Sequence, residues 1–220
     1  LLYLNGGKMF DDNDQVMFND DKGVKALTEL VELHKLGVVD PASFSISSGG
    51  DKATKFVSGK AATMFGWFNT YAFANDKEKS RMVGQLGWGT IPAMQSETAS
   101  LGGSEGYAIS KFSNNKEAAL RFIEFVADKE TQKGIALRTG WMPVRKSVFN
   151  DPELKEKLPY TSTVEEQSKY PAYRFAAPYA QEVIDTLGPE ILEAVNGTKS
   201  PKQALDDAAA KAKTIVAKYK

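Results

Sequence analysis

Few side chains in this sequence could carry out acid–base, nucleophilic or metal-centred chemistry. His34 is the only histidine and cysteine is absent, so zinc sites and Ser-His or Cys-His pairs would lack their usual groups. His34 lies at helical spacing from nearby leucine and valine residues, so it is expected to be a structural histidine on the face of a helix. The acidic run at residues 11–14 lacks the central glycine and distal glutamate of an EF-hand and is typical of a solvated turn.

Paired carboxylates could still hydrolyse a glycosidic bond without histidine or cysteine. Glu105 and Asp185 are candidates, but their spacing does not distinguish them from other acidic residues. We therefore expect a protein that is not an enzyme, with no catalytic residue and no bound metal. The glycine-rich run 102–106 is not a phosphate loop, because it lacks the Gly-Lys-Ser/Thr ending and precedes a predicted strand. Its glycines would instead let a ligand or a crossing chain approach the backbone.

Aromatic residues at turns give a stronger functional signal. Trp67 follows an apolar run, and Trp141 follows the glycine that ends a predicted helix. The C–H groups of a sugar ring pack against a tryptophan face while its hydroxyls bond elsewhere. Each of these tryptophans could equally be a core residue. A third cluster surrounds a guanidinium that can donate to vicinal hydroxyls or to a carboxylate. It consists of Tyr170, Pro171, Tyr173, Arg174 and Phe175.

The composition is that of an ordinary globular protein. The 220 residues are 42% hydrophobic and 25% charged, which suffices for one large domain or two small ones. Basic and acidic residues number 28 each, a balance that argues against a dedicated nucleic-acid binder. No apolar run approaches the roughly 20 residues of a membrane helix. The chain starts at Leu1 without an initiator Met or a signal segment, so we expect a processed protein or a fragment.

The hydrophobic pattern predicts an alternation of helices and strands, which indicates an α/β fold. A hairpin is predicted over residues 8–18, and a surface connection over residues 151–159. Gly188-Pro189 is predicted to separate two helical pieces. The predicted helices cover residues 22–36, 51–58, 113–128, 130–138, 178–187, 190–195 and 200–219. The predicted strands cover residues 61–65, 86–91 and 107–110.

Six motifs follow one another along essentially the whole chain. They are Asn5-Gly6-Gly7 with its hairpin, Phe56-Val57-Ser58-Gly59-Lys60-Ala61-Ala62-Thr63-Met64 before Trp67, Gly106-Tyr107-Ala108-Ile109-Ser110-Lys111, Asn115-Lys116-Glu117-Ala118-Ala119 before Phe122-Ile123, Gly140-Trp141-Met142-Pro143-Val144-Arg145, and Gly197 with Ser200-Pro201. Each motif is weak alone. In this order, however, the set resembles the family 1 extracellular solute-binding proteins, the maltose- and multiple-sugar-binding group of ABC importers.

The resemblance implies an α/β two-lobe clamp of the periplasmic-binding-protein type (type II). Residues 1–98 and 157–220 would belong to its C-terminal lobe. Residues 101–150 would form a segment of the N-terminal lobe, with hinge strands near residues 95–102 and 147–158. Most of the N-terminal lobe would be absent, because family members are about twice as long. One strand and two helices cannot bury their own apolar face, so we expect residues 101–150 to pair with this missing N-terminal half.

The same resemblance implies a function and a set of ligand contacts. The protein would capture a sugar or oligosaccharide in an inter-lobe cleft and deliver it to the membrane subunits of an ABC transporter. It would need no cofactor and would not bind nucleic acid. It would be extracytoplasmic, either periplasmic or lipid-anchored. The alternatives are a protein of the same fold for a polyamine, a glycerol phosphodiester or an oligopeptide, and a carbohydrate-active enzyme. The implied ligand-binding residues are Trp67, Gly102, Gly103, Trp141, Tyr173 and Arg174, with Glu105 as a further candidate.

Overall fold

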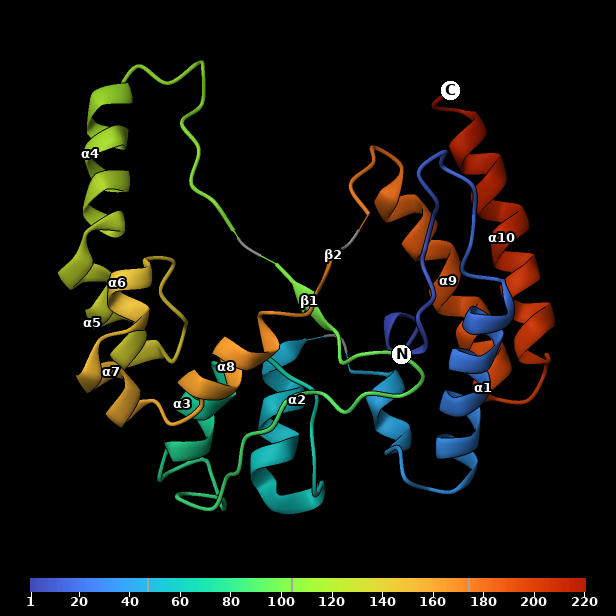
Figure 1. The fold of residues 1–220 in the computed structure, drawn as a ribbon, viewed down its shortest axis with the longest axis horizontal. Helices are drawn as coiled ribbons and strands as arrows, with labels where there is room; N and C mark the ends of the chain where they lie inside the picture. Colours follow the sequence, from blue (N-terminus) through green and yellow to red (C-terminus); the bar gives the residue numbers. More distant parts are fainter. Residues whose placement is uncertain (47, 104, 174) are drawn as a thin grey trace. The chain divides into compact units, whose positions relative to one another are not determined.

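The computed structural model describes residues 1–46, 48–103, 105–173 and 175–220 (Figure 1). The chain forms two compact units. Unit 1 contains residues 1–45, 91–102 and 170–220, and unit 2 contains residues 46–90 and 103–169. This division groups residues 46–90 with residues 103–169. The boundaries expected from the sequence place residues 46–90 with residues 1–45 in one lobe and residues 101–150 in the other. In the described residues, no helix is both long and apolar enough to cross a membrane.

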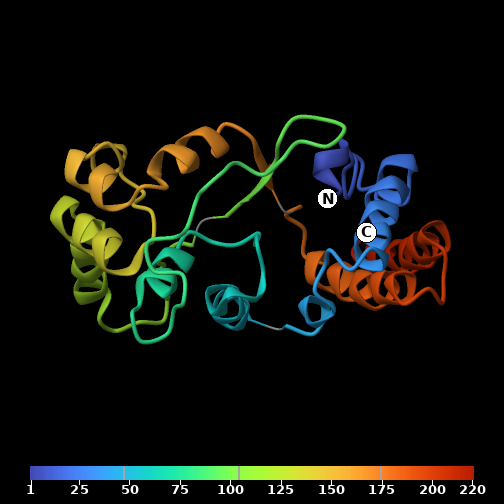
Figure 2. The same cartoon turned by 90° about the horizontal axis from the view of Figure 1, so that it is seen from below.

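Three long helices form the core of unit 1. They are α1 (Asp21–Lys35), α9 (Ala180–Val195) and α10 (Pro201–Ala217). Figures 1 and 2 show α9 and α10 side by side along their lengths. The alanine-rich face of α10 is buried. Small side chains on that face allow the two helices to approach closely.

The predicted break at Gly188-Pro189 is wrong, because α9 continues through it. Proline removes one backbone donor from a helix and crowds the preceding turn, which normally ends or kinks the helix. Here Val183 before the proline and Val195 after it are both buried in the same core cluster. Packing of both halves of α9 against the rest of the unit 1 core therefore outweighs the local cost, since most helix stability in proteins comes from tertiary contacts.

The remaining elements of unit 1 are short. They are η1 (Tyr3–Asn5), η2 (Pro41–Phe44), β1 (Ser100–Gly102) and β2 (Pro171–Tyr173). β1 pairs in parallel with β2, with Gly102 opposite Tyr173. The predicted hairpin is present as a bridge between Phe10 and Val16. The carboxylate of Asp11 accepts from the backbone N–H groups of Asn13 and Gln15, so the acidic run serves as a turn.

Unit 2 is built from short helices. They are α2 (Gly49–Lys55), η3 (Phe56–Lys60), α3 (Thr70–Asn75), α4 (Lys116–Ala127), α5 (Lys129–Thr139), α6 (Lys146–Phe149), α7 (Pro152–Lys157) and α8 (Thr161–Gln167). Helix α7 corrects the prediction of a surface connection over residues 151–159. Asp151 caps it by accepting from the N–H groups of Glu153 and Leu154, and the Leu154 side chain is fully buried.

The three predicted strands of unit 2 are absent from the part of the chain that the structure describes. Residues 61–65, 86–91 and 107–110 run without strand pairing, and Phe65 and Tyr107 are each 64% exposed. The prediction of a buried strand at residues 61–65 is therefore wrong for this chain. The physical reason is that a strand needs a hydrogen-bonded neighbour. Among the described residues, 61–66, 86–90 and 105–109 have no backbone–backbone hydrogen bond.

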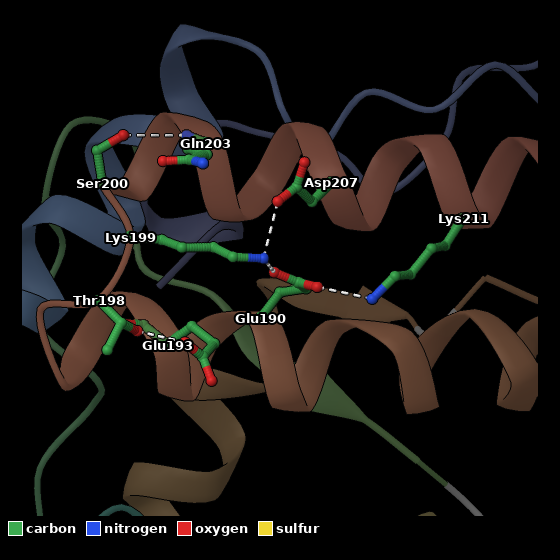
Figure 3. Close-up of polar contacts among 8 residues, drawn as sticks. All are labelled: Glu190, Glu193, Thr198, Lys199, Ser200, Gln203, Asp207 and Lys211. Carbon is green, nitrogen blue, oxygen red and sulfur yellow. Dashed lines mark hydrogen bonds and ion pairs between the residues drawn. The ribbon is translucent and has the colours of Figure 1, made fainter.

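The start of α10 offers a local test of stability. Ser200 Oγ accepts from the backbone N–H of Gln203 at 3.2 Å, where the helix predicted over residues 200–219 begins (Figure 3). Replacing Ser200 by alanine is expected to lower the free energy of unfolding by about 1 kcal/mol, because one backbone donor loses its cap. Urea unfolding followed by circular dichroism measures this change. Ser200→Asp should retain most of the stability, and equal losses in both variants would contradict a capping role.

Candidate functional site

Trp67 lies on a turn of unit 2 between η3 and α3, with its side chain 44% exposed. The carbonyl of Trp67 accepts from the N–H of Thr70 at 3.1 Å, and that of Phe68 accepts from the N–H of Tyr71. These bonds hold the turn at the start of α3. A Cβ atom placed on Gly103 would lie 3.8 Å from Cη2 of Trp67. The structure thus brings two of the predicted ligand residues together, the indole of Trp67 and the backbone of Gly103.

Trp141 lies on a second turn of unit 2, which touches the first. Gly140 ends α5 in the left-handed conformation, at a φ of 75°, and lets the chain turn sharply. A Cβ atom on Gly140 would lie 3.6 Å from the Cα of Asn69 and from the carbonyl oxygen of Phe68. The Trp141 side chain is 49% exposed. We call Trp67, Gly103 and Trp141 the tryptophan patch.

A buried tyrosine links the two turns of the tryptophan patch. Tyr160 is fully buried, and its hydroxyl donates to the carbonyl of Gly140 at 2.6 Å. Its ring stacks on Phe68, with centroids 5.7 Å apart, and also contacts Tyr71 and Trp88. Burial raises the pKa of the Tyr160 phenol, so the group remains a donor. Sequence reasoning missed Tyr160, because its role depends on contacts with residues far away in the chain.

Removing the Tyr160 hydroxyl should loosen the support of the tryptophan patch. Tyr160→Phe is expected to lower the free energy of unfolding by about 1–2 kcal/mol, because the buried Gly140 carbonyl loses its donor. Thermal or urea unfolding measures the loss. Tyr71→Phe is the matched control, since its hydroxyl donates to the Lys157 carbonyl at an exposed site. A loss for Tyr160→Phe no larger than that for Tyr71→Phe would contradict this role.

A second group of predicted residues lies in unit 1. Tyr173 is 68% exposed, and a Cβ atom on Gly102 would lie only 2.8 Å from its Cε1 atom. Glycine at position 102 therefore allows the ring to lie against the β1 backbone. The Tyr3 hydroxyl donates to the Tyr173 carbonyl at 3.0 Å, and Ser96 Oγ donates to the Tyr3 carbonyl at 3.1 Å. Gly102, Tyr173 and Tyr3 form what we call the tyrosine patch. No sequence signal singles out Tyr3.

The other candidates have no such arrangement. Arg174 lies outside the described residues. Glu105 is exposed and, within the described part of the chain, makes no hydrogen bond or ion pair. His34 contacts the ring of Phe44 edge-on, which agrees with the structural role predicted for it. The described residues contain no group of three or more histidine, cysteine or acidic side chains placed to hold a metal.

Comparisons with known proteins find relatives that are about twice as long. Residues 1–160 match the family described as bacterial extracellular solute-binding protein. A probable amino-acid ABC transporter periplasmic-binding protein of Sinorhizobium fredii is 24% identical over 96% of this chain and 47% of its own length. A galactooligosaccharide-binding protein of Bacillus subtilis is 27% identical over 89% of this chain and 45% of its own length. The chain therefore spans about half the length of these curated relatives.

The fold of the chain is similar to that of a solved solute-binding structure. Maltose-bound MalE3 of T. maritima superposes with a TM-score of 0.85 at 25% identity, covering 97% of this chain and 55% of that one. This likeness confirms the predicted periplasmic-binding-protein fold class. The family's description as extracellular agrees with the expected extracytoplasmic location. Because the family match covers residues 1–160, the chain belongs to the bacterial extracellular solute-binding proteins.

Proposed function

We propose that the protein captures a sugar or oligosaccharide outside the cytoplasm and passes it to the membrane subunits of an ABC importer. The observation that carries this proposal is the tryptophan patch, in which Trp67 and Trp141 are about half exposed on adjoining turns. Aromatic side chains that are half exposed on adjoining turns present apolar faces against which a ligand can pack. The names of relatives that bind galactooligosaccharide or maltose support a carbohydrate ligand.

The chemistry of both patches suits a polyol. Indole faces at Trp67 and Trp141 would pack on the C–H faces of sugar rings. Backbone groups at Gly103 have no side chain in the way, so sugar hydroxyls can bond to them. The phenol of Tyr173 in unit 1 can both donate and accept.

The role of the protein would be binding rather than catalysis. The relatives reported above are named as solute-binding proteins, which supports this assignment indirectly. Glu105, one of the two carboxylates that could serve a hydrolase, is exposed and without a polar partner in the described residues.

A thermal-shift screen of the protein at its full encoded length tests the proposal. The panel contains mono-, di- and oligosaccharides, with amino acids, polyamines and glycerol phosphodiesters as controls. A ligand that binds only the native state raises the melting temperature by mass action, by an amount that grows with its concentration over Kd. A shift with one class of sugar would support the proposal. No shift with any sugar, together with a shift from a control class, would overturn it.

A non-sugar solute is the second candidate, because one of the relatives is named for amino acids. The same screen separates the two candidates, because its panel contains both sugars and amino acids. An amino acid would need partners for its carboxylate and ammonium groups. A rise in melting temperature with an amino acid that is also seen in the Trp67→Ala variant would favour this second candidate. A rise in melting temperature with a sugar that is lost in the same variant would favour a carbohydrate ligand.

A further inference from the structure

Tyr160 contacts both turns of the tryptophan patch at once. Its hydroxyl donates to the carbonyl of Gly140, the residue before Trp141, at 2.6 Å. Its ring lies nearly parallel to that of Phe68, the residue after Trp67, with an interplanar angle of 2° and centroids 5.7 Å apart. One side chain therefore fixes the relative position of the two turns that carry the exposed indoles.

The two turns also limit each other's movement. A Cβ atom on Gly140 would lie 3.6 Å from the Cα of Asn69 and from the carbonyl oxygen of Phe68, so these atoms block a shift of the Gly140 turn toward them. A shift in the opposite direction would lengthen the hydrogen bond from the Tyr160 hydroxyl to the Gly140 carbonyl. Packing and this one hydrogen bond thus act in opposite directions and hold the spacing between the turns.

Tyr160 is itself held firmly. Its side chain is fully buried, and its backbone carbonyl accepts from the N–H of Val164 at 3.0 Å. The buried side chains of its core cluster are Ala136, Val148, Leu154 and Leu158. A side chain that is locked by packing can keep neighbouring ligand-contacting groups in one arrangement, whereas a loosely held support lets them move. Because Tyr160 is fully buried, it can act on a ligand only through the two turns.

We propose that Tyr160 is a positioning residue, which sets the arrangement of the Trp67 and Trp141 indoles so that the site prefers a ligand with at least two linked sugar rings. This proposal rests on the proposed function and narrows its substrate class. Each indole can receive the apolar face of one sugar ring. A two-ring ligand uses both indoles and gains from their fixed arrangement, because less ordering remains to be done on binding. A one-ring ligand uses one indole at a time and gains nothing from it.

Isothermal titration of the full-length protein, well below its melting temperature, tests this role. Galactose and glucose are the one-ring probes, and galactobiose and maltose are the two-ring probes. Tyr160→Phe keeps the stacked ring but removes the donor to Gly140. We expect it to weaken binding of the two-ring probes by about 5-fold and that of the one-ring probes by less than about 2-fold. A role in stability alone would leave every dissociation constant unchanged, because nearly all of the protein is still folded at that temperature.

Two further variants complete the titration. Tyr179→Phe is the matched control, since Tyr179 is also buried but lies in unit 1, where its hydroxyl donates to the Asp14 carboxylate at 2.7 Å. It should lower the melting temperature and leave all four dissociation constants unchanged. Gly140→Ala disturbs the same contact from the other side, because its Cβ would lie 3.1 Å from the Tyr160 hydroxyl oxygen. It should reproduce the selective loss of the two-ring probes.

Amide hydrogen exchange without ligand separates failure of this proposal from failure of the proposed function. The N–H groups of Thr70 and Tyr71 bond within the first turn, and that of Gly140 bonds at the end of α5. In Tyr160→Phe they should exchange at least about 5-fold faster, and in Tyr179→Phe at the wild-type rate. Faster exchange in a protein that binds no sugar would overturn the proposed function and the two-ring preference, but not the hold of Tyr160 on the turns.

Three outcomes would overturn the positioning role while leaving sugar binding in place. The first is exchange at both turns that is unchanged in Tyr160→Phe. The second is a dissociation constant that is unchanged in this variant for every probe, or that rises equally for one-ring and two-ring probes. The third is a wild-type protein that binds the one-ring probes as tightly as the two-ring probes.

Discussion

Replacing Trp67 by alanine is expected to weaken sugar binding by about 100-fold, which corresponds to about 2.7 kcal/mol. The reason is that the indole supplies a rigid apolar face beside the Gly103 backbone and next to the Trp141 turn. Alanine removes that face and leaves the C–H groups of the sugar in contact with water. Isothermal titration of the full-length protein, with the sugar identified by the thermal-shift screen, measures the change.

Two further variants separate loss of the ring from loss of the fold. Trp67→Phe retains an aromatic face and should recover part of the affinity, leaving a loss of about 10-fold. Leu36→Ala changes an exposed apolar side chain in unit 1 and should leave the affinity unchanged. Because Trp67 is 44% exposed, more than half of its side chain is buried, so the melting temperature of each ligand-free variant is measured beside the affinity. Sugar binding that is equal in wild type and Trp67→Ala would remove the tryptophan patch from the site.

Replacing Glu190 by glutamine should destabilise unit 1 by about 2 kcal/mol, because a buried carboxylate then no longer balances two ammonium groups. The Glu190 side chain on α9 is 5% exposed. Its oxygens accept from Lys199 at 2.6 Å and from Lys211 at 2.7 Å, and Lys199 also bonds to Asp207 (Figure 3). This network fastens α9 to α10 and to the loop between them. Glu117→Gln, in an exposed pair with Arg121, is the control and should have almost no effect.

The stability that the Glu190 carboxylate contributes to the fold should depend on pH. The hydrogen bond from Lys199, followed by that from Lys211, holds the pKa of the Glu190 carboxyl below its ordinary value of 4.5. A carboxyl with a lowered folded-state pKa contributes stability that is complete above its unfolded value and is lost as pH falls through the folded value. The difference in unfolding free energy between wild type and Glu190→Gln should therefore shrink below pH 4.5. A difference that stays constant over that range would show that the charge of Glu190 does not stabilise the fold.

Helix ends could be predicted because the bonds that make them are local. Asp20 accepts from Gly23 at the start of α1, and Ser200 accepts from Gln203 at the start of α10. Both bonds join residues three positions apart, so short stretches of sequence contain all the necessary information. The identity of Trp67, Gly103 and Trp141 as candidates was also available from the order of the motifs. Their meeting in one unit was not, because it depends on the long-range contact of Gly140 with Asn69.

The sequence by itself determined where the long helices α1 and α10 begin, which family the chain resembles and which aromatic residues are candidates for the site. Only the tertiary structure decided that α9 runs through Pro189, that Tyr160 supports the tryptophan patch and that Tyr3 holds Tyr173. It also decided that residues 61–65 and 107–110 remain unpaired in this chain. The physical reason is the range of the interactions. Caps act within one turn, whereas strand pairing and packing join residues that are distant in sequence, and their partners must be present before the element can form.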